Sequence, residues 1–255
     1  MALRADYGLD APSVVRNLVV AAVLGLAVFA SVALGFWPGR ITVGPLVFEV
    51  AFMGLGAGLA CAGMAVYMAW SSKYGKLAER DRHLDRLALK GQERVLDVGC
   101  GRGLMLIGAA KRLTSGNAVG VDIWQAEDLS GNRPEATLEN VRREGVEGRV
   151  RIETADMRAL PFPDGSFDVV VSKAAIHNLY ERADRLKALS EIARVLAPGG
   201  QVLIDDIRHL GEYAAELRSR GLVEIRRFGN PAIATFWALL TWGSLRPGVL
   251  QARKP

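Results

Sequence analysis

Apolar residues are concentrated in two long stretches within the first 70 residues of the chain. Leu18 to Phe36 contains no charged residue, and the stretch from about Leu46 to Trp70 contains only Glu49, near one end. Because a helix rises about 1.5 Å per residue, either stretch matches the roughly 30 Å hydrocarbon core of a bilayer. We therefore predict two transmembrane helices, at about residues 18–36 and 46–70.

The linker between these stretches reads WPGRITVGP and is rich in turn-forming residues, so we expect an antiparallel helical hairpin. Gly54 and Gly58 share one face of the second predicted helix, and Gly25 lies in the first. Small residues let membrane helices approach closely, which also makes a homo-oligomer through these glycines a candidate. Two alternatives stay open: glycine is simply frequent in membrane helices, and the first stretch is a cleaved signal peptide.

Basic residues follow the second apolar stretch. Five of them lie between Lys73 and Arg86, whereas the linker between the two stretches has only Arg40. The positive-inside rule then predicts that both termini and everything after residue 72 are cytoplasmic. Residues 73–91 have leucines along one helical face and charges elsewhere, so we predict a basic amphipathic linker helix. In this helix His83 is expected to be an exposed residue and not a ligand.

From residue 92 the pattern alternates between short apolar runs and amphipathic segments, which is typical of a parallel sheet covered by helices. The predicted fold class is α/β: a doubly wound, mostly parallel, Rossmann-like sheet with helices on both faces, preceded by the transmembrane hairpin. The domains are expected at 1–72 (anchor), 73–91 (linker helix) and 92–255 (sheet domain). The predicted strands are 94–98, 118–122, 150–154, 167–172, 201–205, 222–227 and 249–254. The predicted helices are 103–113, 134–144, 183–196 and 212–220.

Composition narrows the class of protein. Half of the residues are hydrophobic, which is high for a wholly soluble chain, and the two cysteines cannot form a disulfide framework. The net charge is +5 and the pI is near 9.4, but the basic residues alternate with acids and lack interleaved aromatics. We therefore expect no nucleic-acid partner.

A glycine-rich turn follows the first strand of the sheet domain, in the sequence RVLDVGCGRG. Glycines let the backbone approach a ligand closely, and ligands of doubly wound sheets bind at the carboxyl ends of the strands. Asp97, Asp122, Asp156 and Ser172 are all predicted at that edge. An acid that ends the second strand suits the two hydroxyls of a ribose, so the expected ligand is a nucleoside or a dinucleotide.

The spacing G-x-G-x-G differs from the G-x-G-x-x-G of dinucleotide dehydrogenases. Four motifs carry a resemblance: VLDVGCGRG at 95–103, VGVDI at 119–123, ADMRALPFPDGSFDVVVSKAAIHNL at 155–179 and EIARVLAPGGQVLIDD at 191–206. With these motifs the chain resembles the class I S-adenosylmethionine-dependent methyltransferases, in particular their small-molecule branch, type 11. The resemblance covers residues 92–227. It implies methyl transfer, with S-adenosylmethionine as the cofactor and no metal.

The resemblance also assigns roles to individual residues. Four residues would hold the methionine part of the cofactor, and Asp122 and Ile123 would hold the ribose and the adenine. Asp156 and Met157 would contact the adenine edge and face, and Ser172 and Lys173 would line the space beside the sulfonium. Cys100 corresponds to a small packing residue and is not expected to be catalytic. The four residues at the methionine part are Asp97, Gly99, Gly101 and Gly103.

His177 follows the fourth strand in the sequence AAIHNL, facing the expected position of the methyl group. A histidine with a pKa near 6.5 suits proton removal from the acceptor, so His177 is the candidate catalytic base; the alternative is a packing role in the wall of the site. The polar loop Trp124 to Arg133, which includes Asp128, is either a cap over the cofactor or a plain surface loop. The apolar run Pro231 to Leu245 has three alternatives: an interfacial segment, the wall of a lipophilic pocket, or a core strand.

A cytoplasmic methyltransferase domain tied to a membrane hairpin makes a lipid or another small lipophilic molecule the leading acceptor, with the bilayer as partner. Arsenite is disfavoured because the chain lacks the cysteines used for it, and nucleic-acid bases are disfavoured because SKAA stands where an Asn-Pro-Pro-Tyr-type signature would. Two other functions stay open. The protein is then either a non-catalytic cofactor-binding sensor or scaffold, or an anchored enzyme with a soluble substrate.

Overall fold

The computed structural model describes residues 5–125, 127 and 129–255. The chain divides into two compact units. We call residues 8–76 with 125–131 the hairpin unit, and residues up to 7 with 77–124 and 132–255 the sheet unit.

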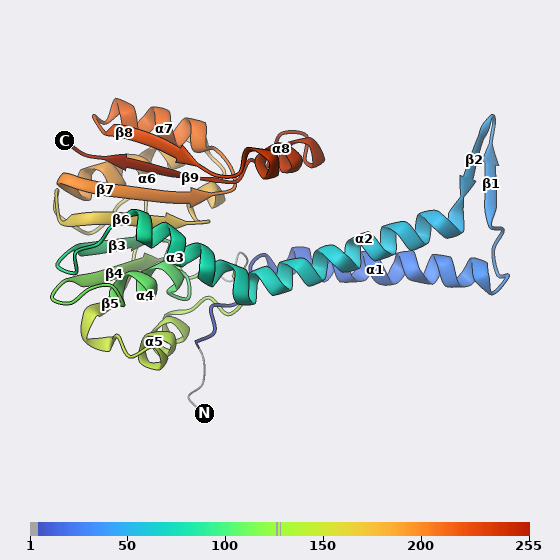
Figure 1. Ribbon diagram of the computed structural model, residues 1–255, viewed down its shortest axis with the longest axis horizontal. Helices are drawn as coiled ribbons and strands as arrows, with labels where there is room; N and C mark the ends of the chain where they lie inside the picture. The colour runs from blue at the N-terminus through green and yellow to red at the C-terminus, as the bar shows by residue number, and fades with distance from the viewer. Residues whose placement is uncertain (1–4, 126, 128) are drawn as a thin grey trace. The chain divides into compact units, whose positions relative to one another are not determined.

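Two long helices form the hairpin unit, α1 (Pro12–Ala33) and α2 (Val50–Trp70), and a π-helical turn η1 (Ser71–Gly75) follows α2. Figure 1 shows α1 and α2 side by side, with a two-stranded β-hairpin at one end. The hairpin consists of β1 (Arg40–Val43) and β2 (Leu46–Glu49), which pair antiparallel. The predicted helical boundaries are therefore wrong in two places: α1 covers residues 12–33 instead of 18–36, and 46–49 are a strand.

The β-hairpin explains the second error. Gly44 takes a φ of +58° and with Pro45 makes a two-residue turn, so Leu46 lies opposite Val43. β-Branched residues on both sides favour the extended conformation. An ion pair of 2.6 Å between Arg40 and Glu49 closes the open end of the hairpin. Glu49 thus belongs to the β-hairpin, and the helix begins after it.

The contact between α1 and α2 passes through glycines. A Cβ on Gly25 would lie 2.7 Å from the carbonyl oxygen of Gly54 and 2.8 Å from the amide nitrogen of Gly58. No side chain fits at such a separation, so the helices pack backbone to backbone, as small residues allow. The three glycines predicted to permit close approach therefore do so between two helices of one chain.

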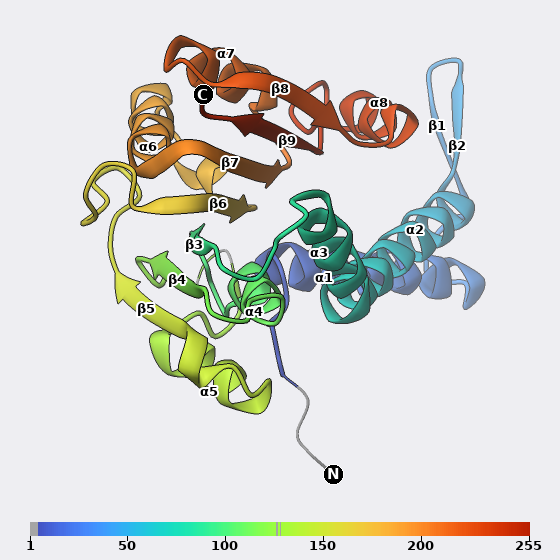
Figure 2. The same cartoon turned by 60° about the vertical axis from the view of Figure 1, so that its left-hand side comes forward.

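The sheet unit is built on a seven-stranded sheet with the order β5-β4-β3-β6-β7-β9-β8 (Figure 2). The pairings from β5 to β7 are parallel, and β9 pairs antiparallel with both β7 and β8. The strands are β3 (Arg94–Val98), β4 (Asn117–Asp122), β5 (Val150–Thr154), β6 (Phe167–Lys173), β7 (Leu196–Asp206), β8 (Val223–Phe228) and β9 (Gly248–Arg253). The mostly parallel, Rossmann-like sheet predicted from the sequence is confirmed.

Helices cover both faces of this sheet because its strands are apolar on both sides. Leu96 and Val98 of β3 belong to one buried cluster, and Val95 belongs to a second cluster on the opposite face. The first cluster includes residues of α6 and α7, and the second includes residues of α3, α4 and α5. The helices are α3 (Lys76–Arg86), α4 (Leu104–Ala110), α5 (Pro134–Arg143), α6 (Arg182–Val195), α7 (Leu210–Ser219) and α8 (Pro231–Leu240), with short turns η2 (Glu147–Arg149) and η3 (Ile176–Asn178).

The face of α3 that carries Leu84 packs into the second cluster. His83 is buried with it, with 5% of its surface exposed, so the prediction of an exposed His83 is wrong. The reason lies in the tertiary structure: Asp205 of β7 pairs with the buried imidazole at 3.3 Å, and the sequence of α3 alone does not reveal this partner.

The apolar run from residue 231 is a helix, α8, so the core-strand alternative is wrong. Pro231 occupies the first turn, and the side chain of Asn230 accepts hydrogen bonds from the amides of Ala232 and Ile233. A capping residue followed by a proline in the first turn is a sequence signal for a helix start, and it distinguishes this run from a strand.

Candidate functional site

The glycine turn joins β3 to α4 at the carboxyl edge of the sheet. Gly99, Gly101 and Gly103 all have positive φ values, of 74°, 50° and 85°. A Cβ on Gly99 would lie 2.3 Å from the Cβ of Ala175, in the segment after β6. The alternate glycines therefore permit both the backbone path of the turn and its close approach to that segment.

Asp97 lies beneath the turn and is 1% exposed. Its Oδ2 accepts a hydrogen bond of 2.8 Å from the amide of Leu106, whereas Oδ1 has no hydrogen-bond partner among the described residues. Burial raises the pKa of this carboxyl to about 7, with a smaller contribution from the nearby Asp122. A buried acceptor with one oxygen unused is a favourable neighbour for a cation at the turn.

Asp122 ends β4 and connects the turn to the next loop. Its Oδ2 accepts a hydrogen bond of 2.8 Å from the amide of Gly101, and its Oδ1 accepts one of 2.6 Å from the amide of Trp124. The side chain of Ile123 is 45% exposed beside it. The indole nitrogen of Trp124 donates to the hydroxyl of Thr154 at the end of β5. The carboxylate of Asp122 and the apolar side chain of Ile123 thus lie next to each other beside the turn. Asp128, in the loop that follows, lies outside the described residues.

The acid after β5 is held by an arginine. The guanidinium of Arg158 donates hydrogen bonds to both carboxylate oxygens of Asp156 and one of 2.7 Å to Asp184 of α6. This pairing holds the pKa of Asp156 below its usual range. Met157 lies next to it, and its methyl carbon would be 3.6 Å from a Cβ on Gly99, so the segment after β5 reaches the glycine turn.

Ser172 and Lys173, two predicted site residues at the end of β6, both bind other residues of the chain. The hydroxyl of Ser172 donates to the carbonyl of Val98 at 2.8 Å and is buried. The amine of Lys173 pairs with Glu79 of α3 at 2.7 Å and also with Asp205 of β7. Burial alone would favour the neutral amine, but the two carboxylates outweigh it and raise the pKa of Lys173 above its usual value.

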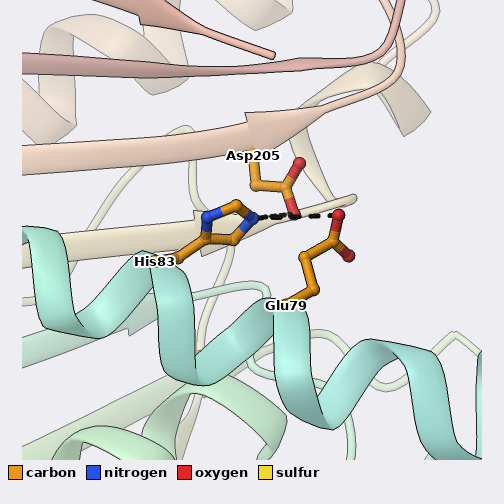
Figure 3. Close-up of side chains that lie close together, drawn as sticks. All are labelled: Glu79, His83 and Asp205. Carbon is orange, nitrogen blue, oxygen red and sulfur yellow. Dashed lines mark ion pairs between the residues drawn. The ribbon is translucent and has the colours of Figure 1, made fainter. Parts of the chain in front are cut away.

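Lys173 belongs to a charge cluster with His83 and Asp205, which are buried, and Glu79, whose side chain is 41% exposed. Figure 3 shows the last three converging from α3 and β7, with the imidazole Nε2 3.3 Å from Asp205 and 3.9 Å from Glu79. Potential metal ligands of these three residues lie within 4.8 Å of one another. The ammonium of Lys173 already supplies a positive charge to both carboxylates, so we interpret the cluster as an ion network that ties α3 to the ends of β6 and β7. That the protein binds no metal stays a prediction.

His177 lies in the turn η3 after β6 and is paired with an acid that the sequence analysis did not single out. Its Nδ1 is 2.6 Å from Oδ1 of Asp206, the last residue of β7. Asp206 is 1% exposed and also accepts hydrogen bonds from the hydroxyl of Tyr213 and the amide of Ile207. The side chain of His177 is 15% exposed. A fixed acid thus orients a partly accessible imidazole.

The signal for Asp206 was present in the motif VLIDD, since adjacent residues of a strand point to opposite faces of the sheet. Asp205 therefore meets α3 and Asp206 meets η3 and α7. Which acid meets which partner follows only from the pairing of strands. A separate hollow of about 420 Å³ opens at the amino ends of the strands, beside Glu93 and Asp168, and none of the predicted site residues lines it.

The edge that carries the glycine turn fits a nucleoside with a cationic amino acid tail. Asp122 is an acceptor for hydroxyls, Ile123 offers an apolar surface, and Asp97 has an unused buried oxygen near the turn. The topological switch lies here too, because β4 and β6 flank β3 on opposite sides. The fold and site together define a Rossmann-like domain for a nucleoside-bearing cofactor.

Comparison with known proteins identifies the kind of domain. Residues 96–204 match the family model of a methyltransferase domain. The 27-O-demethylrifamycin SV methyltransferase of Amycolatopsis mediterranei is 34% identical over 142 residues, which cover 54% of this chain and 48% of that protein. The demethylmenaquinone methyltransferase of Thermus thermophilus is 34% identical over 125 residues, 49% of this chain and 52% of that protein. Residues 96–204 thus form a methyltransferase domain of the type that uses S-adenosylmethionine.

A solved structure shows the same fold. Geranyl diphosphate methyltransferase in complex with its S-adenosyl cofactor superposes with a TM-score of 0.56 at 17% identity, covering 78% of this chain and 91% of that one. This chain spans about half the length of the curated relatives it matches. The roles assigned above to individual residues stay predictions.

Proposed function

We propose that the protein is a membrane-anchored enzyme that transfers a methyl group from S-adenosylmethionine to a small lipophilic acceptor. The observation that carries the proposal is the joining, in one chain, of a methyltransferase domain to two long helices with exposed apolar side chains. An enzyme fixed to a bilayer has ready access to substrates dissolved in it.

The exposure of the two helices supports a membrane anchor. Residues Pro12–Ala33 and Val50–Arg86 contain windows of mean hydropathy 2.1 and 1.7, of which only 6% and 17% are buried. A core helix of a soluble protein would be mostly buried, and exposing this many apolar side chains to water is unfavourable. Length and composition alone would also admit a signal sequence for the first helix. The backbone contact of Gly25 with α2 favours a permanent helical pair instead.

Aromatic residues mark both ends of the helical pair. Trp37 follows α1, and Tyr67, Trp70 and Tyr74 lie at the end of α2 and just beyond it, all exposed. Tryptophan and tyrosine are enriched where a membrane meets water. The α2 helix has 21 residues and is thus about 32 Å long, close to the hydrocarbon thickness. With the basic residues after α2, these features support a methyltransferase domain on the cytoplasmic side.

The chemistry of the site supports a base-assisted transfer. S-adenosylmethionine supplies an electrophilic methyl group, and the domain contributes mainly alignment of the acceptor. With Nδ1 of His177 held by Asp206, Nε2 is the atom that takes the proton from the acceptor. The Asp206 carboxylate is itself held in place by hydrogen bonds from the His177 amide, the Ile207 amide and the Tyr213 hydroxyl, so it stays beside the ring and can stabilise an imidazolium.

The relatives give a chemical direction for the acceptor. Their names describe methylation of a demethylated rifamycin and of demethylmenaquinone, which are small molecules. A small lipophilic acceptor that dissolves in the bilayer agrees with both observations, the small-molecule substrates in the names of the relatives and the exposed apolar helices of this chain.

The test uses the full chain in lipid nanodiscs, incubated with S-adenosylmethionine labelled on the methyl group and with a membrane lipid extract, followed by mass spectrometry. Label in a lipid-soluble product supports the proposal. Label confined to water-soluble products indicates an anchored enzyme with a soluble substrate. Cofactor binding without transfer to any extract indicates a sensor or scaffold.

The role of His177 is tested with the same product. His177→Ala is expected to slow turnover at least ~100-fold if the imidazole is the base, and Asp206→Asn at least ~10-fold, because the ring then loses its charged orienting partner. His209→Asn is the matched control: His209 lies three residues after Asp206 at a φ of +60°, which asparagine tolerates. A loss of only a few-fold in His177→Ala, with cofactor affinity unchanged by calorimetry, would show that the ring is a wall residue.

A further inference from the structure

The segment around α8 exposes large apolar side chains. Ile233 and Phe236 are 51% and 56% exposed, Leu239 is 78% exposed, and Trp242, in the turn after the helix, is 99% exposed. All four lie within ten residues of the chain. Elsewhere in the described sheet unit, exposed large apolar side chains occur singly, as at Tyr180. A concentration of exposed apolar side chains of this kind marks a binding surface.

Strand topology places this patch at the edge that carries the candidate site. β8 is antiparallel to β9, and β9 is antiparallel to β7, so β8 runs in the same direction as β7. The α8 helix follows the carboxyl end of β8, as the arrowheads in Figures 1 and 2 show. The glycine turn, Asp122 and the pair of His177 with Asp206 also lie at carboxyl ends of strands. The apolar helix and the candidate site therefore share one edge of the sheet.

The charge of the surrounding chain indicates what covers the patch. After Glu224 the sequence contains five basic residues and no acidic residue. Arg227 precedes α8 and Arg246 follows Trp242, and both are exposed. Within the described residues, neither forms an ion pair. Apolar side chains flanked by free guanidinium groups match a surface with an apolar interior and anionic head groups.

We propose that α8 is a second membrane contact, which inserts Ile233, Phe236, Leu239 and Trp242 into the boundary between head groups and acyl chains. Arg227 and Arg246 bind anionic head groups. A ten-residue helix is about 15 Å long, half of what a membrane span requires, so it lies in the interface and does not cross it. Docking in this way brings the edge that carries His177 to the bilayer surface. A lipophilic acceptor then reaches the site from the membrane. This consequence rests on the proposed function, whereas the docking of α8 on the membrane does not depend on it.

The test places one fluorescent label in the full chain, reconstituted in vesicles of equal parts phosphatidylcholine and phosphatidylglycerol. Leu239→Cys carries the label in a Cys61→Ser background; Cys100 does not interfere because it is buried and its thiol pKa is raised. Val223→Cys is the matched control, since Val223 is a 45% exposed apolar side chain at the amino end of β8, on the opposite edge of the same sheet. Quenching is measured with iodide in the water and with nitroxide groups on the lipid chains.

The proposal predicts that the label at position 239 is quenched by the lipid nitroxides and at least ~5-fold less by iodide than the label at position 223, because insertion removes it from water. Arg227→Gln with Arg246→Gln should lower the lipid quenching at position 239. Equal iodide quenching at both positions overturns the proposal. Shielding from iodide without lipid quenching also overturns it, because protein, such as a second copy, then covers α8. These readouts need no methyl acceptor, so they fail or succeed independently of the methylation assay.

Discussion

The buried carboxyl of Asp97 offers a sharp test of the electrostatics beneath the glycine turn. Its pKa is about 7 in the folded protein, against an ordinary value of 3.8 for an aspartate side chain. Between these two values the folded state keeps a proton that the unfolded state has lost. The contribution of Asp97 to stability is therefore greatest below about pH 4, falls as the pH rises to about 7, and levels off above it.

The size of this effect follows from the difference between the two pKa values. Each pKa unit corresponds to about 1.4 kcal/mol, so ionised Asp97 lowers the free energy of unfolding by about 4 kcal/mol at pH 8. For a unit of this size, 1 kcal/mol shifts the melting temperature by about 2–4 °C, which gives a total of about 10 °C. Most of this loss is expected between pH 4 and pH 7.

The assay is thermal unfolding of the full chain in detergent, without cofactor, at a series of pH values for the wild type and for Asp97→Asn. An asparagine still accepts the hydrogen bond from Leu106 but does not titrate, so the variant should lose this pH dependence. His209 also titrates: burial and nearby Arg185 lower its pKa, so its contribution to stability increases as the pH rises. Because the wild type and the variant both contain His209, this contribution cancels in the comparison. If Asp97→Asn shows the same slope as the wild type, the assignment to Asp97 is wrong.

Three further predictions concern the turn, the cofactor and the helical pair. Gly99→Ala should lower the free energy of unfolding by more than about 2 kcal/mol and abolish cofactor binding, because the added methyl group clashes with Ala175. Gly145→Ala is the control: its φ is also positive but the space around it is open, so it should lower the free energy of unfolding by only about 1 kcal/mol. Thermal unfolding measures the stability of both variants, and calorimetry measures their cofactor binding. Asp122→Asn should weaken cofactor binding at least ~10-fold in calorimetry, since hydrogen bonds to a charged group contribute about 1.5–3 kcal/mol, and unchanged affinity would remove its ribose role. Gly25→Val should lower the melting temperature in detergent by several degrees through separation of α1 from α2, and Gly56→Val, which points into open space, should not.

The candidate site was predictable from the sequence wherever a residue acts through its position in the chain. Gly99, Gly101 and Gly103 were identified because a tight turn between strand and helix requires glycine, and the structure gives all three positive φ values. Asp122 was identified because the end of a parallel strand faces the ligand edge, and it does contact the turn. Such local requirements are written directly in the order of residue types.

Partners that come from distant segments were not predictable in the same way. Lys173 was placed beside the sulfonium, but its amine pairs with Glu79 and Asp205, which lie 94 and 32 residues away. Asp206 was not singled out, although it holds His177 from a different strand. Pairing of this kind depends on which strands are neighbours, and one sequence does not specify neighbours.

By itself, the sequence determined the alternation of strands and helices, the glycine turn with its acids, and the two apolar stretches, because each depends on the spacing of residue types along a short segment. The tertiary structure decided that His83 is buried, that Asp206 orients His177, and that α8 is an exposed helix at the edge of the site. These features depend on the burial of a side chain and the charge it meets, both of which are set by segments far away in the chain.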